Sequence, residues 1–143
     1  CGLFVCVAVK RCRFEDNRLL ENSGMGISIG SRSTDNTFSG NRIIANTKHG
    51  IEFRKEGDET GAHRNRFERN IVLNNGPGDK KEKAAIVIRG HHHDVIFHQN
   101  TIGHEKPTDK LHAGILVSPH ATGFQSTENQ FRHVKTDVAR QKE

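Results

Sequence analysis

The strongest constraint on the fold of this chain is a repeat built on phenylalanine and asparagine. The segments "DNTFSGNRIIAN" (residues 35–46) and "RNRFERNIVLNN" (residues 64–75) place an asparagine three residues after the phenylalanine and another five residues later. Five such units align on Phe14, Phe38, Phe67, Phe97 and Phe131, with steps of 24, 29, 30 and 34 residues. The extra residues fall in polar loops such as "GPGDKKEK" (residues 76–83). A conserved core with variable loops is typical of a solenoid.

The asparagines of the repeat form two columns. The first consists of Asn17, Asn41, Asn70 and Asn100, and the second of Asn22, Asn46 and Asn75. In the fifth unit, as aligned here, Val134 stands where the first column would continue. We expect the phenylalanines to stack inside the molecule. We expect the asparagines to form ladders whose amides bond one another and the turn backbone.

Alternating apolar residues between the phenylalanines indicate strands with one buried face. The motifs are "GLFV", "GISI", "GIEF", "AIVI" and "GILV". They direct inward the pairs Leu3/Val5, Ile27/Ile29, Ile51/Phe53, Ile86/Ile88 and Ile115/Val117. Each unit then holds about three short strands, which pair with the equivalent strands of the next unit about 4.8 Å away.

This "NxIxxNxxxGI" rhythm resembles the repeat of the pectate-lyase-like proteins, most strongly from Cys12 to Gly103. The resemblance implies an all-β fold, a right-handed parallel β-helix of about five coils with three short strands each. Residues 1–143 then form a single β-helix domain, which we expect to be a fragment of a longer chain. The resemblance also implies a secreted or periplasmic location and an acidic polysaccharide as partner.

Charge and composition narrow the choice of partners. The formal net charge of +5 favours an anionic partner, whether polysaccharide, nucleic acid or lipid. Nucleic acid is not expected, because single strands bind on exposed aromatic rings and only Phe4 and Phe124 are predicted outside the core. No membrane partner is expected, because the longest apolar run, "LFVCVAV", is far too short to cross a bilayer. The three cysteines form no disulfide framework, although a Cys6–Cys12 bridge stays open.

The outer face of the first strand of each coil is where we expect chemistry. Two outward columns follow from the alternation: Phe4, Ser28, Glu52, Val87 and Leu116, and Cys6, Gly30, Arg54, Arg89 and Ser118. Arg54 and Arg89 are thereby predicted to be neighbours on adjacent strands, with Cα atoms about 5 Å apart. Such a pair needs a carboxylate between its guanidinium groups, either from the protein or from an acidic ligand.

By resemblance to polysaccharide lyases and epimerases, the site needs a base and a cation that neutralises a uronate carboxylate. The predicted catalytic residues are Arg89, His91 and Lys55, and the predicted substrate-binding residues are Glu52, Arg54, Arg32 and Glu56. A glycoside hydrolase, which would use carboxylates such as Asp58 and Glu59, fits less well, because the polygalacturonase motifs are absent. The Asp-Pro-His-Asp motif of alginate epimerases and the calcium-binding aspartates of pectate lyases are absent as well.

Two alternatives stay open at this stage. The first is a non-catalytic structural or binding segment of a larger protein, whose open first coil could pair with the rest of that chain or with another copy. The second is a metal- or pH-responsive module built on "HHHD" (residues 91–94), where His91 and His93 form a weak chelating pair for a divalent metal. No further ligand pair has suitable spacing, so no cofactor is predicted.

Overall fold

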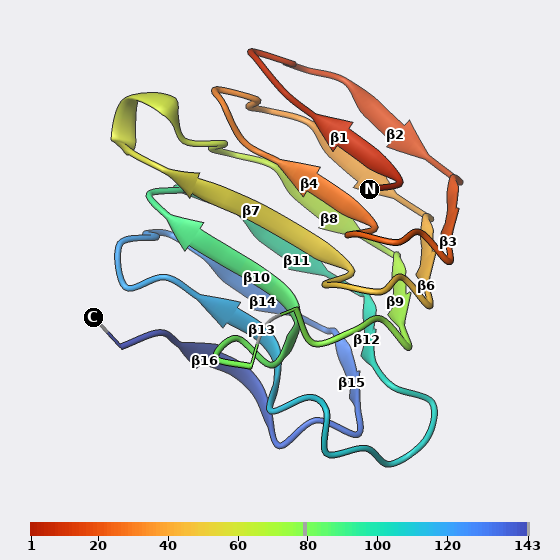
Figure 1. Cartoon of the computed structure of the whole chain (residues 1–143). Helices are drawn as coiled ribbons and strands as arrows, with labels where there is room; N and C mark the ends of the chain where they lie inside the picture. Colours follow the sequence, from red (N-terminus) through yellow and green to blue (C-terminus); the bar gives the residue numbers. More distant parts are fainter. Residues whose placement is uncertain (79, 143) are drawn as a thin grey trace.

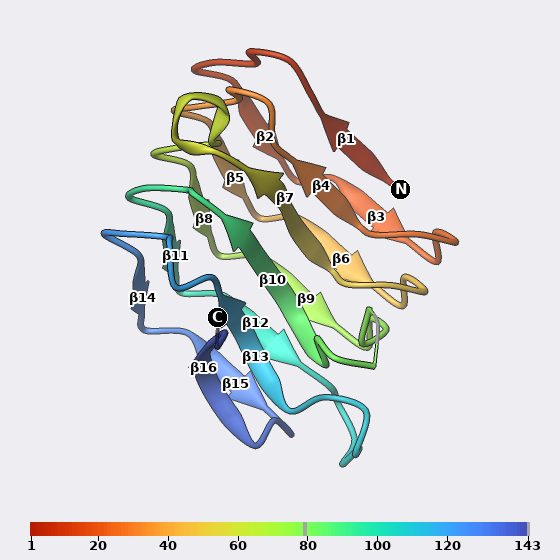
Figure 2. The same cartoon turned by 60° about the vertical axis from the view of Figure 1, so that its left-hand side comes forward.

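Three parallel sheets run along the molecule in the computed structural model, which describes residues 1–78 and 80–142 (Figures 1 and 2). The first sheet contains β1 (Leu3–Val5), β4 (Ile27–Ile29), β7 (Ile51–Glu56), β10 (Ala84–Gly90), β13 (Ala113–Val117) and β16 (Thr136–Arg140). The second contains β2 (Arg13–Glu15), β5 (Thr37–Ser39), β8 (Arg66–Glu68), β11 (Ile96–His98) and β14 (Gln125–Thr127). The third contains β3 (Arg18–Leu20), β6 (Arg42–Ile44), β9 (Ile71–Leu73), β12 (Thr101–Gly103) and β15 (Gln130–Arg132).

Each strand pairs in parallel with its equivalent in the next coil, so the strands form five successive triplets followed by β16. The all-β parallel β-helix of about five coils is therefore confirmed. A single 3-10 turn, η1 (Asp58–Thr60), is the one helical element among the described residues. None of the described segments is a helix that could span a membrane.

The interior is a column of stacked aromatic rings flanked by aliphatic side chains. The Phe14, Phe38, Phe67 and Phe97 rings stack at centroid distances of 4.8, 4.3 and 4.8 Å. The predicted inward pairs of the first sheet are buried, apart from the half-buried Leu3 in the first coil. Strand pairing places equivalent side chains over one another at the strand spacing, which is also the spacing of stacked rings.

Asparagine ladders close the turns, as expected. In the first column each Nδ2 donates to the next Oδ1, over 2.9 Å from Asn17 to Asn41 and 2.9 Å from Asn41 to Asn70. The second column runs from Asn22 through Asn46 to Asn75. A third, which the sequence analysis missed, joins Asn36 to Asn65 over 3.1 Å.

The residue before each asparagine of the first column has a left-handed backbone. These residues are Asp16, Gly40, Arg69 and Gln99, and Glu128, which precedes Asn129, has the same conformation; their φ angles lie between 52° and 65°. Non-glycine residues adopt this conformation at a cost of about 1–2 kcal/mol. The ladder offsets that cost, because Oδ1 of the next asparagine accepts both the backbone N–H and the side-chain amide of the one before it.

The fifth coil corrects our alignment. Phe97 pairs with Ser126, while Phe131 pairs with Ile102 in the third sheet. The first asparagine column therefore continues to Asn129, whose Oδ1 accepts from Asn100 over 2.9 Å, and not to Val134. Phe124, predicted outside, is half-buried and its ring lies 6.2 Å from that of Phe97. It closes the aromatic column from a different backbone position, which a sequence alignment on phenylalanine cannot detect.

The outer face of the first sheet is more covered than predicted. Phe4 is exposed, but Ser28 and Val87 of the same outward column are fully buried. Side chains and connections therefore lie over this face and leave only part of it open. At the N-terminal end, the thiols of Cys1, Cys6 and Cys12 are all unpaired, so no Cys6–Cys12 bridge is present.

Candidate functional site

A register shift between β7 and β10 sets the geometry of the site. Ile88 pairs with Phe53, but Gly90 pairs with Glu56, so β7 holds one more residue than β10 over this stretch. Arg54 and Lys55 together lie opposite Arg89. The predicted one-to-one pairing of Arg54 with Arg89 is therefore wrong. Bulges of this kind bend a strand and redirect its side chains, and they are common next to binding sites.

Arg54 extends toward the N-terminal coils. Its guanidinium donates to Ser28 Oγ and to the carbonyl of Val5, both over 3.0 Å, and it lies 4.4 Å from the centre of the Phe4 ring. These contacts bury Ser28 and hold Arg54 away from Arg89. The two predicted site arginines therefore do not form a clamp.

Arg89 is held by two carboxylates. Its Nε donates to both oxygens of Glu82, over 2.9 and 3.0 Å, and its Nη1 donates to Glu52. The contact with Glu82, followed by that with Glu52, raises the pKa of Arg89 above its usual range even though burial opposes this. Arg89 is therefore a permanent cation. Glu82 was missed because it lies in the polar loop before β10, and no sequence signal shows that this loop folds back over the sheet.

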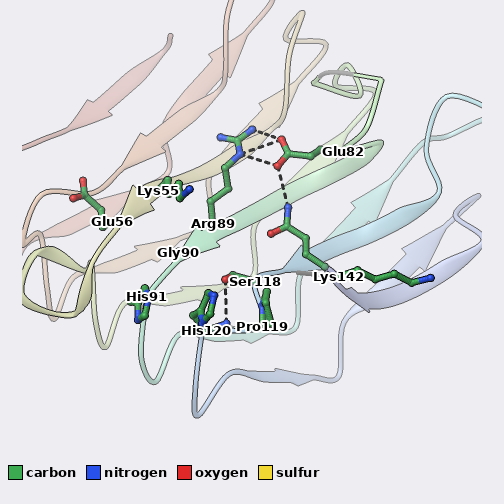
Figure 3. A pocket seen from close by; sticks show the side chains of 11 residues that line it. Lys55, Glu56, Glu82, Arg89, Gly90, His91, Ser118, Pro119, His120 and Lys142 are labelled. Atoms are coloured by element: carbon green, nitrogen blue, oxygen red, sulfur yellow. Dashed lines mark hydrogen bonds and ion pairs between the residues drawn. The ribbon is translucent and has the colours of Figure 1, made fainter.

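A cavity of about 430 Å³ opens beside Arg89 on the outer face of the first sheet (Figure 3). It is lined by Lys55, Glu56, Glu82, Arg89, Gly90, His91, Ser118, Pro119, His120, Gln141 and Lys142. Four predicted site residues, Lys55, Glu56, Arg89 and His91, are thus brought together. The other three, Glu52, Arg54 and Arg32, lie outside its lining. Arg32 is exposed in the turn after β4, where its backbone N–H donates to Thr60.

The charge of the lining is mixed and slightly positive. Lys55, Arg89 and Lys142 oppose Glu56 and Glu82, a balance of +1 when the histidines are neutral. Glu56 accepts hydrogen bonds from the Ser31 backbone and hydroxyl, over 2.8 and 3.2 Å, and these contacts lower its pKa although burial acts in the opposite direction. In Figure 3 its carboxylate lies apart from the Arg89 guanidinium. The Glu56 carboxylate therefore points toward the turn at Ser31. It does not lie between Lys55 and Lys142.

Stacked histidines form one end of the cavity. The His91 and His120 rings are parallel, with centroids 4.7 Å apart, and Figure 3 shows them side by side. His91 Nδ1 lies 3.1 Å from Asp58 Oδ1, and His93 Nε2 lies 2.9 Å from the same oxygen. Because an ionised carboxylate only accepts, both nitrogens carry a proton. These hydrogen bonds, that of His93 first, lower the pKa of Asp58.

The remaining nitrogens distinguish His91 from its neighbours. His93 Nδ1 lies 2.6 Å from the Thr122 hydroxyl, and His63 Nδ1 accepts from the His93 backbone N–H over 3.0 Å. The described part of the chain makes no hydrogen bond to His91 Nε2. In neutral His91 this nitrogen is an open lone pair at the rim of the cavity.

Among the described residues, no group of three or more histidine, cysteine, aspartate or glutamate side chains is arranged to hold a metal ion. His91 and His93 approach the same oxygen of Asp58 rather than a common ligand position. The middle histidine, His92, is buried and bonded to the backbone of Ala62 and Arg54, and burial lowers its pKa to about 4. It belongs to the scaffold.

A smaller cavity of about 200 Å³ borders Arg89 on its other side. It is lined by Met25, Lys48, His49, Glu52, Gly78 and Arg89. His49 donates from Nδ1 to the carbonyl of Ala84 over 2.7 Å, and burial lowers its pKa. Arg89 therefore stands between two hollows on one face of the sheet.

Comparison with known proteins agrees with this architecture. No curated protein matches the chain. A solved structure of a double mutant of the periplasmic alginate epimerase AlgG superposes with a TM-score of 0.60 and 14% sequence identity. The alignment covers 99% of this chain but only 36% of that one, and at this identity the likeness shows the fold alone. A family model described as a right-handed beta helix region matches residues 4–102. This chain belongs to the right-handed β-helix family.

Proposed function

We propose that this chain binds an acidic polysaccharide in the 430 Å³ cavity on the outer face of the first sheet. The observation that carries the proposal is the cavity lining, where Lys55, Arg89 and Lys142 surround a hollow bordered by His91 and His120. Cations around an open hollow suit a chain of carboxylate-bearing sugars. The structural similarity to an alginate epimerase supports the same class of ligand, and the periplasmic origin of that protein supports a location outside the cytoplasm.

The cations differ in how freely they can meet a ligand. Lys55 and Lys142 are exposed, and their ammonium groups can follow a flexible sugar chain. Arg89 is largely buried and fixed on β10, with its charge kept by the glutamates beside it. We therefore assign general attraction to the lysines and the fixed recognition point to Arg89.

Removal of the lysine charges tests the binding. We expect the double variant Lys55→Gln/Lys142→Gln to bind polygalacturonate and alginate about tenfold more weakly than the native chain in calorimetric titrations, since tenfold corresponds to 1.4 kcal/mol. A matched control is Lys106→Gln/Lys110→Gln, which removes two exposed charges from a different hollow. Neutral dextran should not bind. Equal losses in both double variants, or equal binding of dextran, would refute a polyuronate site in this cavity.

A second function, catalysis of proton abstraction, is favoured by the open lone pair on His91. The Asp58 carboxylate holds His91 Nδ1–H and so leaves Nε2 as the basic atom. In this reaction the C–H bond next to the uronate carboxylate breaks, its electron pair delocalises into the carboxylate, and the proton passes to Nε2. Nearby cations then stabilise the extra negative charge. Arg89 does not take the role of base, because its raised pKa keeps it protonated.

Hydrogen exchange on the sugar separates catalysis from binding. We expect incubation with polyuronates in D2O to give one of two products: deuterium beside the uronate carboxylate if the sugar is epimerised, or a carbon–carbon double bond at that carbon if the neighbouring glycosidic oxygen leaves in an elimination. His91→Gln should abolish both products and leave binding within about twofold, because the cations Lys55, Arg89 and Lys142 of the lining remain. If the native chain binds but yields neither deuterium incorporation nor an unsaturated sugar, the chain is a non-catalytic binding segment.

A further inference from the structure

The two carboxylates on Arg89 are held in different ways. Glu52 lies within β7, and its second oxygen accepts from the Ser28 hydroxyl over 3.2 Å. Glu82 lies in the connection before β10 and reaches Arg89 from outside the sheet (Figure 3). Its Oε1 also accepts from the Gln141 side chain over 2.9 Å, which ties it to the segment after β16. Glu52 is therefore part of the sheet, whereas Glu82 is held by side-chain contacts across a connection.

Glu82 occupies the position that a ligand carboxylate needs. Its Oε1 accepts from Nε of Arg89 and its Oε2 accepts from Nη2, which is the bidentate geometry by which arginine binds carboxylates. Both Glu82 and Arg89 line the 430 Å³ cavity, so this pair faces the proposed ligand site. An acidic sugar in this cavity thus meets an arginine whose best binding edge is already filled.

We propose that Glu82 is a specificity-determining residue that a ligand carboxylate replaces on Arg89. This inference rests on the proposed function and adds how the site selects its ligand. Arg89 exposes only 25% of its side chain, so loss of Glu82 without a substitute would leave a largely buried cation short of a partner. A uronate supplies the substitute, and a sugar without a carboxylate does not. Sites whose buried polar groups go unpaired with the wrong ligand discriminate strongly against that ligand.

The exchange makes a counterintuitive prediction for the variant Glu82→Gln. When the resident carboxylate becomes an amide, its hold on Arg89 weakens and a ligand carboxylate competes more easily. We expect trimers of galacturonate or mannuronate to bind Glu82→Gln about tenfold more tightly than they bind the native chain. In the variant, the form of the site in which Arg89 is open to a ligand carboxylate is more populated. Fully methyl-esterified trimers, which keep the sugar ring but lose the charge, should not bind the native chain.

Glu56→Gln is the matched control, because it removes one negative charge from the same cavity without touching Arg89. It should change the affinity for the trimers by less than about threefold, the size expected for a screened charge. Circular dichroism would check that each variant remains folded. The Arg89 side-chain Nε–H resonance offers a direct readout. It should shift when the trimer binds the native chain, and the shifted resonance should resemble that of the Glu82→Gln complex with the trimer.

The outcomes separate the two proposals. Tighter binding by Glu82→Gln than by Glu56→Gln supports the exchange. Equal or weaker binding by folded Glu82→Gln, or tight binding of the methyl ester by the native chain, overturns it and leaves polyuronate binding intact. Absence of trimer binding by both the native chain and Glu82→Gln overturns the proposed function together with this inference.

Discussion

Two corners of the coil use the same stacking geometry for different purposes. At the corner between the second and third sheets, one asparagine per coil bonds the next, from Asn17 to Asn129. At the corner after the first sheet, the Asn36–Asn65 ladder stands beside histidine rings that stack in separate pairs, His63 with His93 and His91 with His120. An amide donates on one side and accepts on the other, so the same residue can repeat in every coil. An imidazole can titrate, and its partners here change from coil to coil.

This difference indicates which parts of a repeat protein are candidates for function. In a uniform stack such as the first asparagine column, each side chain bonds its neighbours in the adjacent coils, so the stack serves as scaffold. The departures from uniformity lie on the first sheet, where β7 carries an extra residue and Glu82 folds onto Arg89. The predictions below test whether the scaffold and the site respond differently.

The largest effect is expected in the aromatic column. Phe67 stacks between Phe38 and Phe97 and also meets the edge of Phe53. Phe67→Ala should lower the free energy of unfolding by about 4 kcal/mol, through lost burial and an unfilled cavity. Urea titration monitored by circular dichroism measures it. The control Phe4→Ala, on the exposed face, should cost about 1 kcal/mol through its contact with Arg54. If Phe67→Ala and Phe4→Ala lowered the free energy of unfolding equally, Phe67 would not belong to a buried aromatic column.

The second-largest loss of stability is expected at Asn70, the central asparagine of the first column. Asn70→Ala removes the acceptor for Asn41 and the donor to Phe38 and Asn100, all of them buried. We expect a loss of about 3 kcal/mol, because several buried groups are left unsatisfied. Asn17→Ala, at the exposed end of the same ladder, should cost less than about 1 kcal/mol. If both variants lose the same stability, the ladder does not stabilise the coils cooperatively.

A pH effect should separate the histidine corner from the neutral asparagine corner. Burial lowers the pKa of His92 to about 4 in the folded chain, against 6.5 for an ordinary histidine. Between these values the unfolded chain binds more protons, so stability is complete above pH 6.5 and is lost as the pH falls toward 4. We expect His92 to account for about 2 kcal/mol of loss between pH 7 and pH 5. The variant His92→Gln should show a flatter pH profile in this range, and an unchanged slope would contradict the assignment.

The smallest effect is expected on the outside of the turns. Asp35 and Arg64 form a bidentate ion pair over 2.8 and 3.1 Å, and this contact lowers the pKa of Asp35. Both side chains are substantially exposed, so water and salt screen the pair. Asp35→Asn should change the free energy of unfolding by less than about 0.5 kcal/mol, and by less still in 1 M NaCl. A loss above 1 kcal/mol would show that charged turns also act as scaffold.

Much of the scaffold could be predicted because its signal is repeated. Phe38, Phe67 and Phe97 recur with asparagine at a fixed offset, and burial and hydrogen bonding leave few alternatives for that pattern. Where the repeat weakens, the prediction failed: Phe131 was aligned on residue type, whereas the register places Ser126 in the column. The site was predicted only in part. Lys55, Arg89 and His91 do meet around one cavity, but Glu82, His120 and Gln141 come from loops and from the segment after β16, where no repeat guides the prediction.

Periodicity along the chain was enough to predict most of the regular part of this protein: the inward pairs of the first sheet, two asparagine columns, and the parallel stacking of the coils. These follow from short-range alternation and from the requirement that equivalent positions lie over one another. The organisation of the outer face, in contrast, does not follow from any periodicity of the sequence. One extra residue in β7 separates Arg54 from Arg89, and the loop carboxylate Glu82 joins Glu52 of β7 beside Arg89. Such contacts join positions with no fixed spacing, so the three-dimensional path of each loop decides them.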